Sequence, residues 1–190
     1  MNKVYRKLAF TNIKNNGSLY LPYIISGIVT VAMFYIMMFL NNSKGLEKIY
    51  GSSYLTSIMA LGVGIIAVFS YIFIFYTNSF IIKRRKKEIG VYNILGMEKR
   101  HIAKVMGIET VTVALIAIIG GIVTGMLFSK LSILLLYKIL AVKETVKFEI
   151  NFSTIINTLI VFGILYALTL IYNMMQIKLA NPIELLRGGN

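Results

Sequence analysis

The sequence predicts an all-α polytopic membrane protein with four transmembrane helices, an N-terminal amphipathic helix and a short cytoplasmic helix between the second and third spans. Three observations lead to this fold class. Apolar residues make up 57% of the 190 residues and charged residues only 14%, which is more apolar side chain than a soluble domain of this size can bury. The apolar residues form four long runs. The basic residues cluster beside those runs, as they do at a membrane surface.

Each apolar run is long enough to cross a bilayer, because about 20 helical residues at 1.5 Å per residue cover the ~30 Å hydrocarbon core. The second run carries no charged residue, and Glu109 interrupts the third near its start. We expect Glu109 to lie at the membrane interface and to pair near Lys104, rather than to be a functional carboxylate inside the membrane. The expected spans are residues 19–40, 54–82, 105–128 and 152–177.

The four spans are expected to form a single domain over residues 19–177. The segment that follows, residues 178–190, reads as a short cytoplasmic helix and a linker. Asn181 and Pro182 have the residue types of a helix N-cap and first helical position, which predicts that the short helix begins there.

The N-terminal segment, residues 1–18, reads as an amphipathic helix that lies at the membrane interface. Val4, Leu8 and Ile13 are expected to face lipid, while the basic residues between them contact the headgroups. The alternative is a frayed basic tail that does no more than set the orientation of the first span.

The distribution of basic residues predicts the topology. Fourteen of the 20 Lys and Arg residues fall in the N-terminal segment, the loop over residues 83–104 and the segment after the fourth span, and six fall in the other two loops. Because basic residues are retained on the cytoplasmic side, both termini and the 83–104 loop are expected to be cytoplasmic in a multi-pass protein of the cell membrane.

The composition excludes several classes of functional site. The chain has no cysteine and one histidine, so thiolate chemistry and a histidine-based metal site are not expected. It also lacks the G-x-x-x-x-G-K-[ST] phosphate-binding motif, so any ATP hydrolysis belongs to another polypeptide. We therefore expect no catalytic residues and no cofactor. Nucleic-acid binding is not expected either, because the basic residues serve the membrane topology.

The loop over residues 83–104 has more pattern than a stop-transfer signal requires. Residues 83–87 are five consecutive cations, which mark the membrane surface because each would cost about 2.5–3.5 kcal/mol at the bilayer centre. Ile89, Tyr92 and Leu95 then repeat every three residues, as on one face of a short helix. Gly96 follows at the position where a helix end favours a left-handed residue. An apolar face on a cytoplasmic helix requires a surface to pack against.

Residues 85–102 read R-K-K-E-I-G-V-Y-N-I-L-G-M-E-K-R-H-I. They resemble the R-x-x-E-I-G-V signature that the FtsX-like permeases of ABC transporters carry between their second and third spans. The resemblance extends to the four-span layout and to residues 179–187, L-A-N-P-I-E-L-L-R, where members carry a Pro-x-x-x-Leu-Arg element. The loop between the first and second spans, residues 41–53, is short. This short loop and the N-terminal helix are most similar to the N-terminal four-span part of bacitracin-type peptide-antibiotic resistance permeases.

In that family the loop is a coupling helix that docks into a groove on a cytosolic ATPase subunit. Glu88 would then pair with a partner arginine, Gly90 would permit close approach of the partner's backbone, and apolar side chains would serve as anchors. The alternative is that Glu88 only offsets its basic neighbours and that the apolar face lies on the membrane. The residues to which the resemblance gives this coupling role are Glu88, Ile89, Gly90, Val91, Tyr92, Leu95 and Gly96.

The third span also contains a G-x-x-x-G pattern formed by Gly121 and Gly125. This spacing puts two residues without side chains on one helix face, where another helix can approach closely. It predicts a helix-packing role, although such pairs also occur by chance in apolar sequences.

The resemblance implies a permease subunit, or the N-terminal part of one, in a bacterial ABC transporter that exports or removes peptide antibiotics or lipid-linked cell-wall precursors. The alternative is a signalling or scaffold protein that couples an ATPase to a sensor kinase or a cell-wall hydrolase without translocation. The expected partners are the lipid bilayer, a dimeric cytosolic ATPase and a sensor histidine kinase. Because the resembled permeases are much longer, the chain is expected to be a fragment that needs the remaining permease half, or a half-permease.

Overall fold

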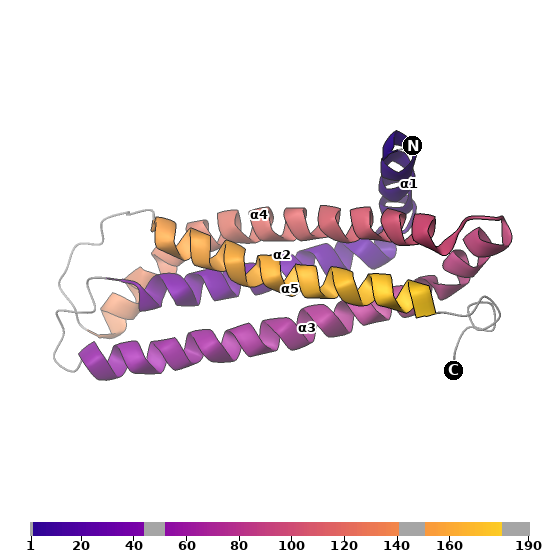
Figure 1. The fold of residues 1–190 in the computed structure, drawn as a ribbon. Coiled ribbons are helices and arrows are strands. Elements are labelled where there is room, and N and C mark those ends of the chain that lie inside the picture. The colour runs from indigo at the N-terminus through magenta and orange to yellow at the C-terminus, as the bar shows by residue number, and fades with distance from the viewer. Residues whose placement is uncertain (1, 44–51, 141–150, 180–190) are drawn as a thin grey trace. The chain divides into compact units, whose positions relative to one another are not determined.

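The computed structural model describes residues 2–43, 52–140 and 151–179, and every regular element in these ranges is an α-helix (Figure 1). The short helix expected to begin at Asn181 and Pro182 lies outside the described residues. The helices are α1 (Asn2–Asn15), α2 (Gly17–Asn41), α3 (Ser52–Ile94), α4 (Lys99–Ile139) and α5 (Phe152–Leu179).

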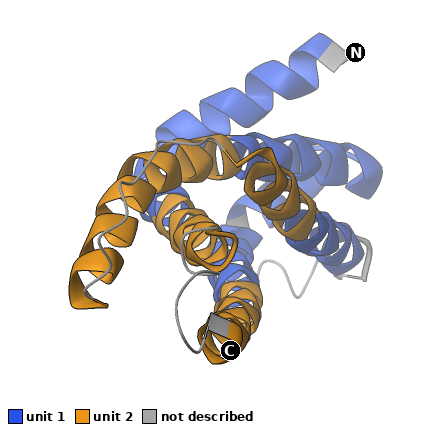
Figure 2. Ribbon diagram, turned by 90° about the vertical axis from the view of Figure 1, so that its left-hand side faces the viewer, with its two compact units in different colours: residues 1–25, 73–115, 164–190 blue, residues 26–72, 116–163 orange. Residues whose placement is uncertain are grey.

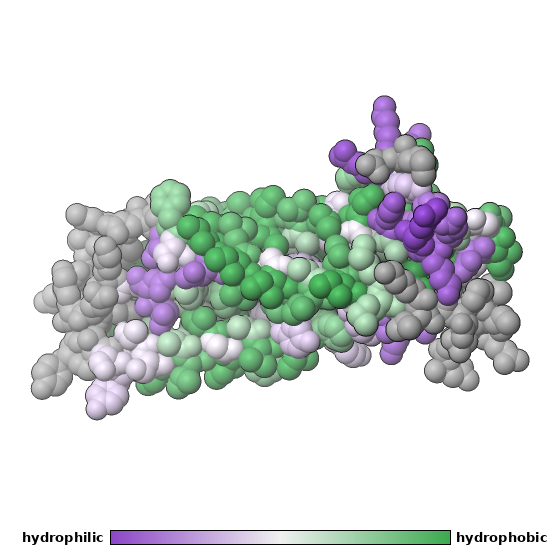
Figure 3. Space-filling view, viewed as in Figure 1, coloured by the Kyte–Doolittle hydropathy of each residue, from purple (hydrophilic) through white to green (hydrophobic). Residues whose placement is uncertain are grey.

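Four of the five helices are long and apolar enough to cross a membrane, which confirms the predicted all-α fold with four spans. The candidate spans are Gly17–Asn41, Ser53–Lys86, Lys99–Ile139 and Phe152–Ile177. In the second of these, only 11% of the most apolar window is buried. Figure 3 shows hydrophobic side chains covering the visible faces of these helices. Because water would make such a surface costly, the chain is a multi-pass membrane protein.

The helices divide into two compact units, which are coloured blue and orange in Figure 2. Unit 1 comprises residues 1–25, 73–115 and 164–190, and unit 2 comprises residues 26–72 and 116–163. Unit 1 therefore holds α1, the start of α2, the C-terminal half of α3, the N-terminal half of α4 and the C-terminal half of α5. It also holds the whole of the charged segment.

The helices continue through the charged segment, where the sequence suggested a separate short helix. α3 runs without a break for 43 residues to Ile94, so the apolar face after residue 88 belongs to the end of a long helix. Lysine, arginine and glutamate are good helix formers, and no proline lies in this stretch to interrupt the backbone hydrogen bonds. The short helix expected around Ile89, Tyr92 and Leu95 is thus the end of α3 and not a separate element.

One side of α1 packs against the other helices of unit 1. Ala9 and Asn12 are buried, and Ile13 contacts a cluster formed by Tyr20, Tyr23, Ile81 and Val113. Val4 is exposed, as is Phe10. Of the three residues expected to face lipid, Val4 is available to do so, whereas Ile13 turns toward the protein.

In unit 2, the paired glycines of α4, Gly121 and Gly125, lie against α2. A Cβ atom added at Gly121 would lie 2.9 Å from the carbonyl oxygen of Ile28, and one added at Gly125 would lie 2.9 Å from the Cβ of Tyr35. Both distances are shorter than real Cβ atoms adopt. The two helices can approach this closely in unit 2 only because these positions lack side chains.

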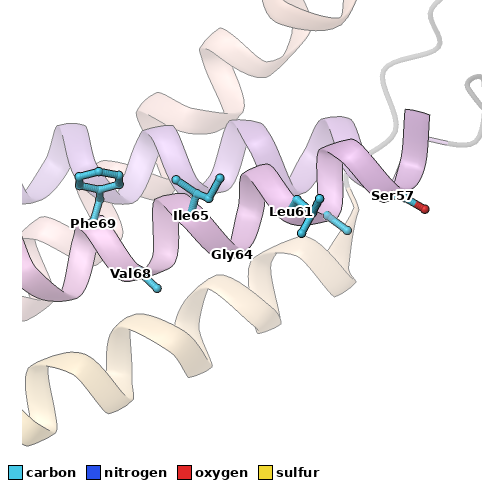
Figure 4. Close-up of a pocket in the computed structure, with 7 residues that line it drawn as sticks. Ser57, Leu61, Gly64, Ile65, Val68 and Phe69 are labelled. Atoms are coloured by element: carbon cyan, nitrogen blue, oxygen red, sulfur yellow. The ribbon is translucent and has the colours of Figure 1, made fainter. Parts of the chain in front are cut away.

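Unit 2 also carries an open apolar groove of about 920 Å³ along α3 (Figure 4). A Cβ atom added at Gly64 would meet nothing within 4 Å, and the hydroxyl of Ser57 donates to the backbone carbonyl of Ser53 in its own helix. The lining is therefore a lipid-compatible helix face with no free polar group to orient a ligand. Its residues are Ser57, Ala60, Leu61, Gly64, Ile65, Val68 and Phe69.

Candidate functional site

The corner between α3 and α4 is the candidate site, and its turn is defined by backbone hydrogen bonds. Gly96 has a φ of 89°, a conformation that glycine adopts without a steric penalty. Its N–H donates to the carbonyl of Asn93 at 3.1 Å, and the N–H of Met97 donates to the carbonyl of Tyr92 at 3.0 Å. These two bonds form a Schellman motif, which satisfies the last carbonyls of α3. The geometry fixes where α3 stops and where α4 begins.

The inner side of the corner packs into unit 1. Ile89 is 3% exposed and belongs to a core cluster with Ile102, Met106 and Ile177, against which Tyr92 and Met97 also pack. Gly90 is buried as well. Ile89 and Gly90, to which the family resemblance gave partner contacts, are therefore buried in unit 1, and Tyr92 is partly buried there.

The outer side of the corner presents apolar side chains that nothing in the described chain covers. Val91, Ile94 and Leu95 are 48%, 64% and 75% exposed. The side chain of Glu88, one turn earlier, is 40% exposed. Figure 3 shows hydrophobic side chains at this corner and hydrophilic side chains gathered around α1 and the start of α4. Ile94 was missed by sequence reasoning, although it lies three residues after Val91 and so shares its helix face.

Behind this surface, unit 1 contains a buried network of charged and polar side chains. Arg85 is 1% exposed and forms an ion pair with Glu109, which is 2% exposed. A terminal nitrogen of Arg85 also donates to the hydroxyl of Tyr20 at 2.5 Å, and that hydroxyl donates to Glu109 at 2.8 Å. The expected pairing of Glu109 near Lys104 was wrong. Its partner is an arginine from the basic run.

The same network continues to α1 and to the exposed glutamate. Asn12 donates to Glu109 at 2.9 Å and accepts from the hydroxyl of Tyr92 at 3.2 Å. The Nε of Arg85 donates to Glu88 at 3.0 Å, and the amide of Asn16 donates to the same carboxylate oxygen at 3.4 Å. Side chains from α1, α2, α3 and α4 are thus joined by hydrogen bonds within unit 1. A network satisfied in this way holds its members in one arrangement.

Comparison with known proteins identifies the chain. Residues 60–182 match the family described as FtsX-like permease C-terminal. The chain belongs to the FtsX-like permease family. It is 31% identical over 186 residues to the ABC transporter permease YvcS of Bacillus subtilis, an alignment that covers 97% of this chain and 29% of that protein.

Two further relatives of this FtsX-like permease are bacitracin export permease proteins named BceB. The one from Bacillus subtilis is 30% identical over 185 residues, which cover 95% of this chain and 28% of the relative. The one from Halalkalibacterium halodurans is 25% identical over 171 residues, covering 90% and 26%. The chain therefore spans less than a third of the length of the curated relatives that it matches.

The region of the FtsX-like match includes a second polar cluster in unit 1, placed on three of the spans. Asn173 of α5 and Asn78 of α3 exchange amide hydrogen bonds of 3.1 and 2.6 Å, and Asn173 also donates to the hydroxyl of Thr110 on α4 at 3.0 Å. Buried amides in a membrane span need such partners because neither lipid nor apolar side chains can replace water. The cluster ties the three helices of this FtsX-like domain together.

The FtsX-like permease shows no metal-binding arrangement among the residues that the structure describes. No group of three or more His, Asp or Glu side chains is close enough there to hold an ion. The buried carboxylate of Glu109 is already occupied by Arg85, Tyr20 and Asn12. Its negative charge is therefore neutralised by Arg85 within unit 1.

Proposed function

We propose that this chain is the part of an ABC transporter permease that receives ATP-driven motion from a separate cytosolic ATPase. The motion would be used to export peptide antibiotics or to remove them, or their lipid-linked cell-wall targets, from the membrane. Membership of the FtsX-like permease family supports the coupling part of this proposal. The names of the two BceB relatives, bacitracin export permeases, support the substrate class.

One observation carries the coupling proposal: the exposed apolar surface at the α3–α4 corner. Val91, Ile94 and Leu95 are exposed beyond the end of the candidate span Ser53–Lys86, after a run of basic residues, so we place them outside the hydrocarbon core. Apolar side chains that cluster on a surface in this way commonly act as the anchors of a protein interface. Glu88 lies beside them with its side chain partly exposed, so it can accept a charge-assisted hydrogen bond from an arginine of the ATPase.

The proposal includes an orientation and a division of the chain. Both termini and the corner would be cytoplasmic, because 14 of the 20 basic residues fall on that side. Residues 1–18 would lie at the membrane interface, residues 83–104 would form the coupling segment between spans two and three, and residues 178–190 would return to the cytoplasm. The ATPase would act as a dimer, and a sensor histidine kinase would join the complex.

The coupling proposal is tested by co-purification of the permease with a candidate cytosolic ATPase subunit. Leu95→Glu places a charge in the centre of the proposed interface, and we expect it to lower ATPase recovery by about tenfold, as loss of an interface anchor does. Ile139→Glu is the matched control, because Ile139 is 79% exposed at the last residue of α4. Equal recovery with Leu95→Glu and with the wild type would remove the corner from the interface.

A further inference from the structure

Among the residues that the structure describes, Arg85 is the most deeply buried charged side chain, with 1% of it exposed, although it is one of five consecutive cations. We infer that Arg85, Glu109 and Tyr20 are positioning residues that pass displacement of the α3–α4 corner to α1 and the start of α2. This inference rests on the proposed function, because it assumes that a partner moves the corner. It assigns these residues no contact with the ATPase.

Arg85 cannot serve as a partner contact. Its side chain is 1% exposed, and it donates to Glu88, Glu109 and Tyr20. A planar guanidinium can serve these three acceptors at once, whereas the ammonium of a lysine is a single point charge. Arg84, the preceding residue, is exposed and lies over the ring of Phe80 at 5.1 Å. The two arginines therefore differ in role although they are adjacent.

The network has one exposed end and one buried end. Glu88 lies at the exposed end, beside the apolar surface of the corner. Glu109 lies at the buried end and holds Tyr20 of α2 and Asn12 of α1 through hydrogen bonds of 2.8 and 2.9 Å. Arg85 contacts both carboxylates. It is therefore the residue through which the two ends are connected.

Movement of the end of α3 would displace Arg85 together with its hydrogen-bond partners. A buried ion pair resists separation because each charge left alone in an apolar surrounding is strongly unfavourable. Glu109 and its two partners must then follow Arg85, and α1 and the start of α2 must follow Asn12 and Tyr20. Asn16, at the junction of α1 and α2, contacts Glu88 directly and provides a second connection. Coupling between sites can be carried by a contiguous set of satisfied contacts, and this set lies wholly within unit 1.

The test uses a fluorescent label on α1 in the intact permease–ATPase complex in nanodiscs. The 190 residues contain no cysteine, so Val4→Cys, at an exposed position of α1, gives a specific labelling site in this part of the protein. We expect the label to change its emission when ATP is added. Glu109→Gln should reduce that change by about fivefold, and Tyr20→Phe, which removes only one hydroxyl, by about twofold.

Each variant has a matched control of the same chemistry. Lys138→Gln likewise removes a charge, from an exposed side chain in the last turn of α4, and Tyr76→Phe removes a hydroxyl from an exposed tyrosine. Both should leave the ATP response unchanged. The ATPase should co-purify equally with all four variants, because none of them alters the exposed corner. If Glu109→Gln fails to fold, Tyr20→Phe still gives the comparison, since it keeps the ion pair.

The outcomes separate this inference from the proposed function. An α1 label that does not respond to ATP, or that responds fully in Glu109→Gln and Tyr20→Phe, would overturn the inference while leaving ATPase binding at the corner intact. Loss of ATPase co-purification in Tyr20→Phe would also overturn it, because the network would then shape the docking surface itself. Failure of the wild-type permease to bind the ATPase would instead contradict the proposed function.

Discussion

Arg85 on α3 and Glu109 on α4 form a buried ion pair between residues 24 positions apart in the chain. Both side chains lie within candidate membrane spans, where an isolated charge is costly. Tyr20 and Asn12 complete the hydrogen bonds of the glutamate, and Glu88 takes a further donor of the arginine. The pair therefore belongs to the structure of unit 1 as well as to the proposed coupling route.

Removing one member of this pair should destabilise the protein strongly. We expect Glu109→Ala to lower the free energy of unfolding by about 3–5 kcal/mol, because Arg85 would be left buried without its counter-charge. Thermal unfolding in detergent, followed by circular dichroism, measures the change. Glu98→Ala is the control, since its pair with Arg100 is exposed and should contribute about 0–1 kcal/mol. Equal losses from the two substitutions would contradict a special role for the buried pair.

The turn that ends α3 should depend on the conformation of Gly96. With a φ of 89°, this position disfavours a β-branched side chain, and we expect Gly96→Val to cost about 1–2 kcal/mol. Gly96→Asn should cost much less, because asparagine tolerates the left-handed region at helix ends. Unfolding curves of the two variants give the comparison. Identical curves would mean that the turn adapts without strain.

The basic run over residues 83–87 contains both exposed and buried side chains. It illustrates which features of the fold could be predicted from the sequence and which could not. The number of spans, the end of α3 at Gly96 and the family followed from run lengths, residue types and a motif. The burial of Arg85 did not follow from these features. The positive-inside rule counts basic residues in a loop and does not distinguish one of five consecutive cations from the others. A signal was present, since Asn78, Ile82, Arg85, Ile89 and Tyr92 alternate four and three residues apart, which places Arg85 on the stripe that faces the protein.

The partner of Glu109 could not be read from the sequence for a different reason. Lys104, five residues before Glu109, was the expected pairing partner. In the structure the carboxylate of Glu109 pairs with Arg85, which lies on another helix. Which helices are neighbours depends on tertiary packing, and a single sequence shows only the periodicity of each helix. The same limit applies to Ile94, whose exposure depends on which side of α3 the core cluster covers.

Helix contact in unit 2 should be sensitive to a single methyl group on α4. We expect Gly121→Ala to lower the free energy of unfolding by about 1–3 kcal/mol, because the added Cβ would overlap Val31 and the backbone of Ile28. Gly163→Ala is the matched control, because a Cβ there would meet nothing within 4 Å, and alanine is the better helix former. Thermal unfolding of the two variants in detergent measures the difference in their free energies of unfolding. A larger loss at Gly163 would contradict the packing described for α2 and α4.

The proposed orientation predicts opposite accessibility for the two ends of α4. Leu95→Cys, just before α4, should react with a membrane-impermeant maleimide only when the reagent reaches the cytoplasmic side, because basic residues flank this corner. Ile139→Cys, at the last residue of α4, should react from outside intact cells. Both positions are exposed, so side-chain burial does not bias the comparison. Labelling of both from the same side would contradict the topology.

The central claim, that the exposed α3–α4 corner seats on an ATPase, is tested most directly by site-specific cross-linking in membranes. A photoreactive amino acid at position 95 should form a covalent adduct with the ATPase subunit, and one at position 139 should not. An adduct at position 95 that Glu88→Lys weakens, with the ATPase present at the same level, is the predicted result. Cross-linking of position 95 to lipid alone, while the ATPase binds the permease elsewhere, would contradict the account.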